Sequence, residues 1–433
     1  MANIHIIDNG NPFNNGVMAM ALGFRDGLIR TCGHDHSVTV LLNTPSTFIS
    51  SAGRYSRYGL STVPNGLARW RSGPPKCGRI FSKLLPVTGS YWSWGQRYGI
   101  RITHLGGWKP EQADIVVSLC GEDYFSDNWP LSLCKFADIQ YSFLQKQGIP
   151  YVVMAQTFGP FTRSYGRLLA EKHLAQAALV TARDDVSFDN VTKDLGITEH
   201  VHRTGDLAFL MKPDEWSMVE QRHPELRSLH FAETQWVGVS VSRLFARSVF
   251  DRLSSPSKRI ETFFVQFAAG LDLILEQNDD IRILFTPHVT EKGNDDRDAG
   301  QEVVQRMKLP NRVVALRDEY TAPEIKAVIG RCDAFIGCRM HALIAAVSQA
   351  VTTLPLAYSP KTMDVIGKAM DYPFAMDFRN MEPHVAGGEL VRQFTEIWRQ
   401  RETLSVKLKE DVQKTEALSY QNFKLLRPLL KAF

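Results

Sequence analysis

The chain has 433 residues, of which 44% are hydrophobic and 22% are charged, and its formal net charge at neutral pH is +4. This composition is typical of a folded globular protein, and the length is sufficient for two ordinary domains. A charge of +4 on so long a chain is too small to indicate nucleic-acid binding. An anionic ligand must therefore be recognised by a local group of cations.

The six cysteines are scattered without the Cys-x-x-Cys spacing of a metal or redox site. The first residues lack the basic and apolar parts of a signal peptide, so we expect a cytoplasmic protein. The longest apolar run, residues 341–357, contains His, Ser and Gln and is too short and too polar to span a membrane.

Short apolar runs that are typical of buried parallel strands recur along the chain, each followed by a stretch of helical character. They lie at 4–7, 38–42, 114–119, 151–155, 236–241, 281–285, 312–316 and 334–337. This alternation predicts an α/β fold with two Rossmann-like, doubly wound domains that face a cleft, residues 1–212 and 213–433. The polar, proline-bearing segment 212–234 would join them, and the tail should form a closing helix at about 400–433.

The segment from about 44 to 110 differs from the rest, because no Asp or Glu occurs between His36 and Pro110 while cations alternate with aromatic residues. One interpretation is a surface excursion whose charges are solvated. The other is a face that contacts anionic phospholipids or the diphosphate of a lipid-linked substrate, through Arg forks and interfacial Trp. The basic residues are Arg54, Arg57, Arg69, Arg71, Lys76, Arg79, Lys83, Arg97, Arg101 and Lys109, and the aromatic ones include Tyr55 and Tyr58.

Another group of cations interrupts the most apolar part of the chain. Arg339 and His341 follow the run 334–337 and open a helix, and Lys361 follows the next strand-like run, 351–357. The carboxyl ends of parallel strands meet at one edge of a sheet, so we expect these three side chains to lie close together. A helix N-terminus and an Arg fork both favour carboxylate or phosphate, which predicts a site for a small, highly charged anion. The alternative is a buried core histidine beside a buried salt bridge.

These residues also resemble a known family. Residues 338–342, Cys-Arg-Met-His-Ala, and 358–361, Tyr-Ser-Pro-Lys, are similar to the Ser-Arg-Leu/Met-His-Ala and Tyr-x-x-Lys elements of the polysaccharide pyruvyl transferases. Further segments resemble elements of that family in the same order along the chain. They are 156–161, 182–187, 205–209 and 286–289, the last followed by Asp295 and Asp296.

The resemblance implies a GT-B-like fold and transfer of a pyruvyl group from phosphoenolpyruvate to a sugar of a cell-surface polysaccharide or its lipid-linked precursor. It also implies that Arg183, Arg339, His341 and Lys361 hold the phosphate and carboxylate of the donor. We expect no cofactor beyond phosphoenolpyruvate, no metal ion and no nucleic acid. The His-Asp-His run at 34–36 is interpreted as a polar turn, because alternating residues rarely converge on one ion.

The first domain departs from the commoner family pattern, Gly-Asn-x-Gly-Asp. Residues 8–16 read Asp-Asn-Gly-Asn-Pro-Phe-Asn-Asn-Gly, whose small residues allow close backbone approach to a ligand and whose amides can bind sugar hydroxyls. Residues 121–123, Gly-Glu-Asp, place two carboxylates at a strand end, or alternatively in solvent. The candidates on the acceptor side are Asp8, Asn14, Asn15, Glu122, Asp123 and His288.

We expect His341 to supply or relay a proton to C3 of phosphoenolpyruvate, since the ordinary pKa of histidine, about 6.5, suits proton exchange near neutrality. Protonation makes C2 electrophilic, a sugar hydroxyl attacks, phosphate leaves, and a second hydroxyl closes a cyclic ketal. The three other cations would neutralise the phosphate. The base stays open among Asp8, Glu122, Asp123 and His288.

Two other classes of function stay open. A GT-B glycosyltransferase with a nucleotide-sugar donor would share the fold, and stabilisation by nucleotide diphosphate rather than by phosphoenolpyruvate would identify it. The other is an inactive member that binds glycan or acts as a scaffold. Four cationic or protonatable groups at strand ends disfavour that class, because folding alone does not require them.

Overall fold

The structure is a computed structural model that describes residues 1–8, 11–42, 53–64, 110–119, 125–127, 131–253, 255–291, 293–357, 363–368, 372–379 and 381–433. The chain divides into two compact units. Unit 1 comprises Met1–Pro12, Met20–Leu210 and Leu418–Phe433, and unit 2 comprises Phe13–Ala19 and Met211–Ala417. The change of unit after Leu210 lies near the expected division at 212. Two stretches differ from that expectation, because 13–19 group with unit 2 and 418–433 with unit 1.

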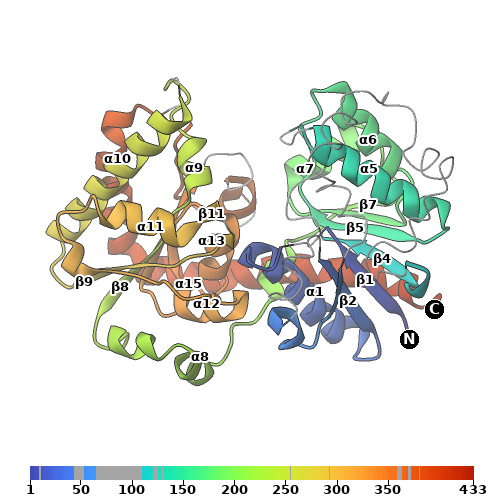
Figure 1. Ribbon diagram of the computed structural model, residues 1–433, viewed down its shortest axis with the longest axis horizontal. Coiled ribbons are helices and arrows are strands. Elements are labelled where there is room, and N and C mark those ends of the chain that lie inside the picture. The colour runs from blue at the N-terminus through green and yellow to red at the C-terminus, as the bar shows by residue number, and fades with distance from the viewer. Residues whose placement is uncertain are drawn as a thin grey trace, which may run out of the picture. The chain divides into compact units, whose positions relative to one another are not determined.

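Unit 1 is built on a parallel sheet in which the described strands have the order β3-β2-β1-β4-β5-β6-β7. Strands β4 and β5 are buried along their whole length, as expected for a sheet with helices on both faces (Figure 1). The strands are β1 (Asn3–Ile7), β2 (Ser37–Leu42), β3 (Ser61–Pro64), β4 (Ile115–Ser118), β5 (Tyr151–Gln156), β6 (Leu179–Ala182) and β7 (Val201–Arg203). The longer helices are α1 (Asn15–Cys32), α5 (Leu131–Lys146) and α6 (Ser164–Leu174), followed by the short α7 (Asp185–Asp189).

Unit 2 contains a second parallel sheet, with the order β12-β9-β8-β13-β14-β15 among the described strands and helices on both faces (Figure 1). The strands are β8 (Gln235–Ser240), β9 (Ile281–Phe285), β12 (Val313–Ala315), β13 (Ala334–Gly337), β14 (Thr352–Ala357) and β15 (Met376–Asp377). A small hairpin is formed by β10 (Thr290–Glu291) and β11 (Asn294–Asp295). The helices are α8 (Trp216–Arg222), α9 (Arg243–Arg247), α10 (Pro256–Glu276), α11 (Asp296–Val304), α12 (Ala322–Ile329), α13 (Met340–Val347) and α15 (Pro383–Leu430).

Both sheets have the Rossmann order, in which the third, second and first strands along the chain are followed by the fourth, fifth and sixth. The strand order therefore reverses beside β1 and β4 in unit 1 and beside β8 and β13 in unit 2. Ligands of such sheets bind outside the carboxyl ends of the strands at this point. Asp8 follows β1 and Arg339 follows shortly after β13, so each unit places a charged residue at its reversal point.

Only residues 53–64 and Pro110 of the basic segment are described. Gly53–Ser56 form a helical turn and β3 joins the sheet, while Arg54 and Tyr55 are 9% and 0% exposed. These two side chains are therefore buried, whereas the neighbouring Ser56 and Arg57 are exposed. The other basic residues of this segment, apart from Arg57, lie outside the described residues.

The predicted connection 212–234 is also different from expectation, because it forms α8 and the 3₁₀ helix η6 (Pro224–Leu229) within unit 2. Its apolar residues Val219, Leu226 and Leu229 are buried. The terminal helix is longer than expected, from Pro383 to Leu430. Among the described residues, no helix has the length and apolar content that a membrane span needs.

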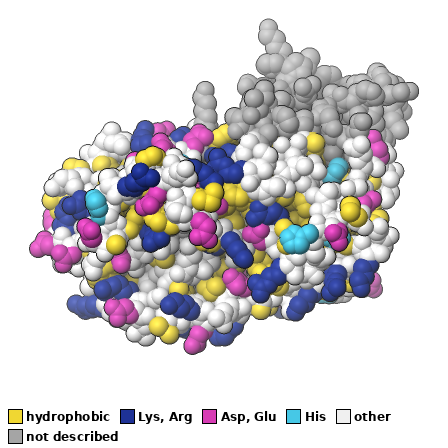
Figure 2. Space-filling model, turned by 90° about the horizontal axis from the view of Figure 1, so that it is seen from below, with side chains coloured by type: hydrophobic (Ala, Val, Ile, Leu, Met, Phe, Trp, Pro, Cys, Tyr) yellow, Lys and Arg dark blue, Asp and Glu magenta, His cyan; other side chains and the backbone are white. Residues whose placement is uncertain are grey.

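The described surface carries charges of both signs. On the face in Figure 2, Lys and Arg side chains lie among Asp and Glu side chains. This mixture agrees with the small net charge of the chain. The cations predicted to bind an anion are those at the strand ends.

Candidate active site

Arg339 lies at the carboxyl end of β13, immediately before α13, with extended backbone (φ −92°, ψ 117°). Its side chain does not cap the helix that it precedes but extends to Asp296. The distances are 2.7 Å from Nη2 to Oδ1 and 3.2 Å from Nε to Oδ2, and Nη2 also lies 3.0 Å from Oδ1 of Asn294. The ion pair is mostly buried, with side-chain exposures of 14% for Arg339 and 2% for Asp296. The salt-bridge alternative is thus realised, at the predicted edge of the sheet.

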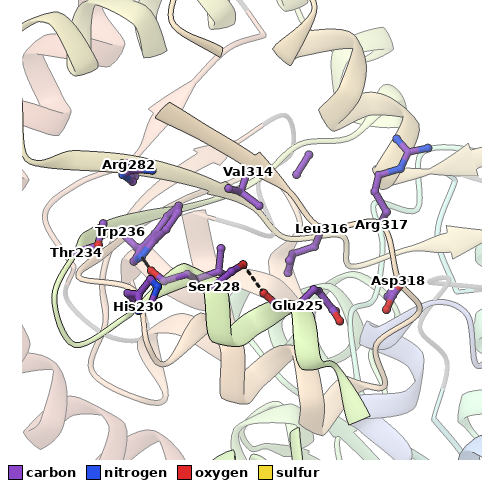
Figure 3. Close-up of a pocket in the computed structure, with 12 residues that line it drawn as sticks. Glu225, Ser228, His230, Thr234, Trp236, Arg282, Val314, Leu316, Arg317 and Asp318 are labelled. Atoms are coloured by element: carbon purple, nitrogen blue, oxygen red, sulfur yellow. Dashed lines mark hydrogen bonds between the residues drawn. The ribbon is translucent and has the colours of Figure 1, made fainter. Parts of the chain in front are cut away.

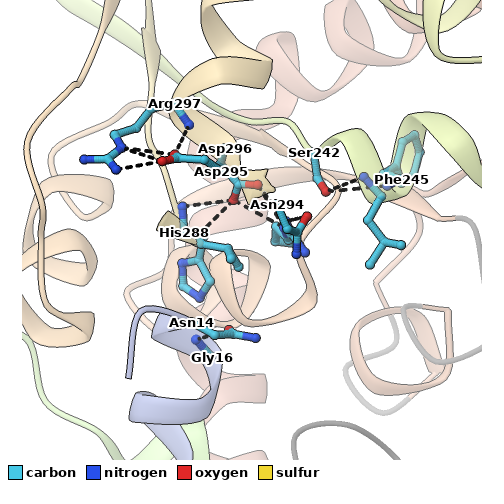
Figure 4. Close-up of polar contacts among 12 residues, drawn as sticks. Asn14, Gly16, Ser242, Phe245, His288, Asn294, Asp295, Asp296 and Arg297 are labelled. Carbon is cyan, nitrogen blue, oxygen red and sulfur yellow. Dashed lines mark hydrogen bonds and ion pairs between the residues drawn. The ribbon is translucent and has the colours of Figure 1, made fainter. Parts of the chain in front are cut away.

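Asp296 connects three segments of unit 2. It is the first residue of α11, and its Oδ2 accepts hydrogen bonds from the backbone N–H groups of His288 (3.1 Å) and Val289 (2.9 Å) (Figure 4). Burial raises the pKa of this carboxyl, and Arg339 and the two backbone donors oppose that rise. Asp296 therefore fixes the Arg339 fork against the loop that carries His288. Sequence reasoning named Asp296 only as part of a motif, although its place at a helix start was visible.

His288 has the most unusual surroundings in the site. The residue is only 3% exposed, and neither nitrogen of its ring has a hydrogen-bond partner within the described part of the chain. Burial lowers the pKa of His288 well below the ordinary value, and the positive charges of His341 and Arg339 lower it further. The ring is therefore neutral at neutral pH. Buried polar atoms without partners are costly, and they mark places where a ligand or water can bind.

The beginning of α1 lies against the His288 loop. The backbone N–H of Asn15 donates to the carbonyl of His288 (2.9 Å), and that of Thr290 donates to the carbonyl of Phe13 (2.9 Å). Oδ1 of Asn14 accepts from the N–H of Gly16 (3.0 Å) and so caps the helix. Figure 4 shows the His288 ring pointing toward this helix start.

Asn15 corrects the expectation that both amides face a sugar. Its Nδ2 donates to the backbone carbonyl of Tyr320 (3.1 Å), and the residue is only 1% exposed. Asn14 is half-buried, and its side chain caps α1 by accepting the hydrogen bond from the N–H of Gly16. The two residues therefore hold the start of α1 in place within unit 2.

Gly16 is required by the position of His341. A Cβ atom at Gly16 would lie 2.4 Å from Nδ1 of His341, closer than any side chain tolerates. His341 is the second residue of α13 and is half-buried. Gly16 was predicted to allow close approach of the backbone to a ligand. In the structure it allows close approach of the backbone to His341, the candidate acid.

In unit 1, Asp8 is held by a network of donors at the strand ends. Its carboxylate accepts from Ser118 Oγ (2.7 Å), Gln140 Nε2 (2.6 Å) and Tyr141 OH (2.9 Å), and it is 3% exposed. Burial raises its pKa, opposed by these three hydrogen bonds. Gln156 donates to Ser118, while its buried Oε1 has no hydrogen-bond partner among the described residues. The carboxylate of Asp8 is thus occupied by protein donors.

Arg183 follows β6 and is buried within unit 1. Its Nε donates to Thr157 Oγ1 (2.8 Å) and its Nη1 lies 3.0 Å from Asp206 Oδ2, with side-chain exposures of 2% and 0% for the ion pair. Three motifs of the sequence, 156–161, 182–187 and 205–209, therefore meet at one place. The guanidinium of Arg183 is thus held by protein groups of unit 1.

The predicted site residues thus fall into three groups. Unit 2 brings together Arg339, His341, His288, Asn14 and Asn15, whereas Asp8 and Arg183 belong to unit 1. Lys361, Glu122 and Asp123 lie outside the described residues.

Comparison with known proteins gives a family and a fold. A family model described as polysaccharide pyruvyl transferase matches residues 18–360. Among solved structures, the chain is similar to a UDP-GlcNAc 2-epimerase from Neisseria meningitidis bound to UDP-GlcNAc, with 9% identity, all of both chains covered and a TM-score of 0.57. It is also similar to Anabaena HepE in complex with UDP and glucose, with 12% identity, the same coverage and a TM-score of 0.55. These neighbours are GT-B enzymes, and the predicted α/β, GT-B-like fold is confirmed.

Proposed function

Because the chain belongs to the polysaccharide pyruvyl transferase family, we propose that it moves a pyruvyl group from phosphoenolpyruvate to a sugar of a cell-surface polysaccharide or its lipid-linked precursor. The products would be a cyclic pyruvate ketal and phosphate. The observation that carries the proposal is the grouping of Arg339, His341 and the His288 ring, which has no hydrogen-bond partner among the described residues, at the strand ends of unit 2.

The donor is an anion of high charge, so its site must supply cations and hydrogen-bond donors. The start of α13 provides backbone N–H groups and the positive end of a helix dipole, and the Arg339 side chain does not cap them. Asp296 orients the Arg339 fork, although it also offsets part of its charge. Lys361 enters the proposal through the family resemblance. Arg183 stays a weaker candidate, because its side chain is buried in unit 1.

The proposed reaction begins with proton transfer from His341 to C3 of phosphoenolpyruvate. A sugar hydroxyl oxygen then bonds to C2, a base takes the hydroxyl proton, and the bond between C2 and the phosphate oxygen breaks. The oxygen of a second hydroxyl of the same sugar then bonds to C2 and closes the ketal, and the proton of this hydroxyl passes to the released phosphate. Arg339 stabilises the departing phosphate.

Among the candidates for the base, we propose His288. Its lowered pKa keeps the ring neutral, so a nitrogen lone pair is available at neutral pH. Asp8 is less suitable, because its carboxylate oxygens already accept three hydrogen bonds.

The second candidate function is a GT-B glycosyltransferase with a nucleotide-sugar donor. The observation in its favour is that two similar structures were solved with UDP or a UDP-sugar bound. At 9% and 12% identity, that similarity concerns the fold and leaves the donor open.

Thermal unfolding with added ligands separates these two functions. We expect phosphoenolpyruvate to raise the Tm of the wild type, inorganic phosphate to raise it less, and UDP to leave it unchanged. In His341→Asn the shift by phosphoenolpyruvate should shrink, while the exposed His384→Gln should behave as wild type. Stabilisation by UDP with none by phosphoenolpyruvate would assign the glycosyltransferase function instead.

We further propose a lipid-diphosphate-linked acceptor and contact with anionic membrane, which rest on the basic segment at about 44–110. Flotation with anionic and with neutral liposomes tests this contact. Binding to anionic liposomes alone is expected, and failure with both would remove the support for a membrane-bound acceptor.

A further inference from the structure

A second polar cluster lies in unit 2 and is not used by the proposed reaction. It contains His223, which lies between α8 and η6, Glu225 in the first turn of η6, and Asp318, which follows β12. One ligand-type atom from each residue lies within 4.8 Å of the other two. We propose that these three side chains bind a divalent transition-metal ion, with Zn²⁺ as the closest match.

The distances within the cluster fit a shared ion better than direct hydrogen bonds. Nδ1 of His223 lies 3.6 Å from Oε1 of Glu225 and 3.7 Å from Oδ2 of Asp318. Good hydrogen bonds from nitrogen to oxygen span about 2.7–3.2 Å, so both separations are too long. Two ligands at about 2.1 Å from a tetrahedral zinc ion are about 3.4 Å apart, close to these values.

The imidazole of His223 is buried and oriented for such a role. The residue is 8% exposed, and its Nδ1 has no hydrogen-bond partner among the residues that the structure describes. Its ring stacks on that of Tyr320, with centroids 4.1 Å apart and an angle of 29° between the planes. A buried nitrogen that faces two carboxylates without a hydrogen bond is the observation that distinguishes this cluster from ordinary surface charges.

Further charged and polar groups lie behind these ligands. Nε2 of His223 lies 3.7 Å from Oε2 of Glu324, which is also too long for a good hydrogen bond, so this carboxylate acts on the ring as a nearby negative charge. Glu324 is itself fixed by Thr321 and by Arg222. Tyr320 OH donates to Oε1 of Glu225 at 2.6 Å and so orients that carboxylate.

The cluster borders a cavity of about 410 Å³, whose lining includes both Glu225 and Asp318. Figure 3 shows these two carboxylates at one end of the cavity and Trp236 and Arg282 at the other. An ion held by three protein ligands would therefore have room for a fourth ligand, such as water. One nitrogen and two oxygens favour zinc and its first-row neighbours over magnesium and calcium, which prefer all-oxygen sites.

The cluster was invisible in the sequence. His223 and Glu225 lie in the segment interpreted as a connection, and Asp318 is far along the chain, so no ligand spacing occurs. The proposal departs from the expectation of no metal ion, and it does not depend on the proposed transfer reaction.

Metal titration of the full chain, without an affinity tag and after treatment with EDTA and dialysis, tests the proposal. Calorimetry should show that the wild type binds one equivalent of Zn²⁺, and Co²⁺ should give the visible absorption of a four-coordinate ion with nitrogen and oxygen ligands. Asp318→Asn and Glu225→Gln should each weaken Zn²⁺ binding by roughly tenfold or more, because each removes an ionised ligand. Glu319→Gln, which changes the neighbouring exposed carboxylate, should bind Zn²⁺ as the wild type does.

Three results would overturn the proposal. The first is that the wild type does not bind Zn²⁺. The second is that Asp318→Asn and Glu225→Gln bind Zn²⁺ as tightly as the wild type does. The third is a Co²⁺ spectrum with thiolate absorption, which would place the ion at a cysteine. Circular dichroism of each metal-free variant establishes that it is folded, so a loss of binding reports on the ligands. Absence of binding by a folded wild type would mean that the carboxylates hold a protonated His223 instead.

Discussion

At the scale of single residues, His288 couples the stability of the protein to pH. Its pKa is lowered by burial and by two neighbouring positive charges, so the folded protein resists adding a proton to this ring. The unfolded chain binds that proton below about pH 6.5. The free energy of unfolding therefore falls as the pH drops below that value, and the contribution of His288 is fully present above it.

We predict that His288→Gln reduces this acid sensitivity. One such histidine contributes a slope of up to about 1.4 kcal/mol per pH unit below pH 6.5, and the variant should lack this contribution. Urea unfolding of wild type and variant between pH 5 and 7.5, chosen to span about one unit on each side of the ordinary pKa, measures the difference.

The comparison isolates His288 because the wild type and the variant share the other buried histidines with lowered pKa values, His5 and His173. The exposed His384→Gln is the matched control and should keep the slope of the wild type. Equal slopes for wild type and His288→Gln would contradict the account of this residue.

Gly16 provides a second prediction at this scale. Gly16→Ala places a methyl group 2.4 Å from Nδ1 of His341, so the histidine or the start of α1 must move. We expect a loss of stability of about 1–3 kcal/mol, as for other overpacked sites, and a large decrease in turnover. Gly388→Ala in α15, where an added Cβ has no neighbour within 4 Å, should be neutral or slightly stabilising. Unchanged turnover in Gly16→Ala would show that the exact position of His341 is unimportant.

At the scale of elements, the motifs of the first half of the chain form one interlocked group in unit 1. Thr157 and Asp206 accept hydrogen bonds from the guanidinium of Arg183, and Oγ of Ser187 accepts one from the backbone N–H of Phe158. The sequence identified these segments and their order, since their residue types resemble a family. It did not predict their mutual contacts, because hydrogen bonds between segments leave no periodicity.

The strands were predicted unevenly for a physical reason. Buried strands that consist mostly of apolar residues, such as β1 and β8, were recognised, whereas β3, β6 and β7 were not. These three have only three or four residues each and include polar side chains, so they look like loops. The segment that forms η6 was also missed, because its polar, proline-bearing composition was interpreted as a connection, although proline is favoured in a first helical turn.

The end of α15 carries a prediction at this scale. Within unit 1, Oδ1 of Asn422 accepts from the hydroxyls of Thr181 (2.6 Å) and Thr204 (2.9 Å), and its Nδ2 donates to the carbonyl of Gly205 (3.0 Å). Asn422→Leu leaves these buried groups without partners, so we expect a loss of about 2–5 kcal/mol in the free energy of unfolding. The exposed Lys424→Leu on the same helix should change it by less than about 0.5 kcal/mol. Urea unfolding measures both, and similar values would refute an anchoring role for Asn422.

At the scale of the whole molecule, alternation of apolar runs and helical stretches was enough to predict two Rossmann-like units. Which residues belong to each unit was harder to predict from the sequence. Residues 13–19 group with unit 2, although the rest of the first 210 residues group with unit 1. Arg339 and His341 were found through their position after β13. The role of Asp296 as the partner of Arg339 was not predicted, because the two residues are 43 positions apart in the sequence.

The central claim, that phosphoenolpyruvate is the donor, is tested most directly by transfer of label. The protein is incubated with [¹⁴C]phosphoenolpyruvate and a mixture of cell-envelope polysaccharide and lipid-linked oligosaccharide, and label in the glycan is compared with phosphate released. We predict that label enters the glycan with one phosphate released per pyruvyl group, and that His341→Asn abolishes both. Transfer of a labelled sugar from a nucleotide sugar to the same mixture, with no label from phosphoenolpyruvate, would contradict the proposed function.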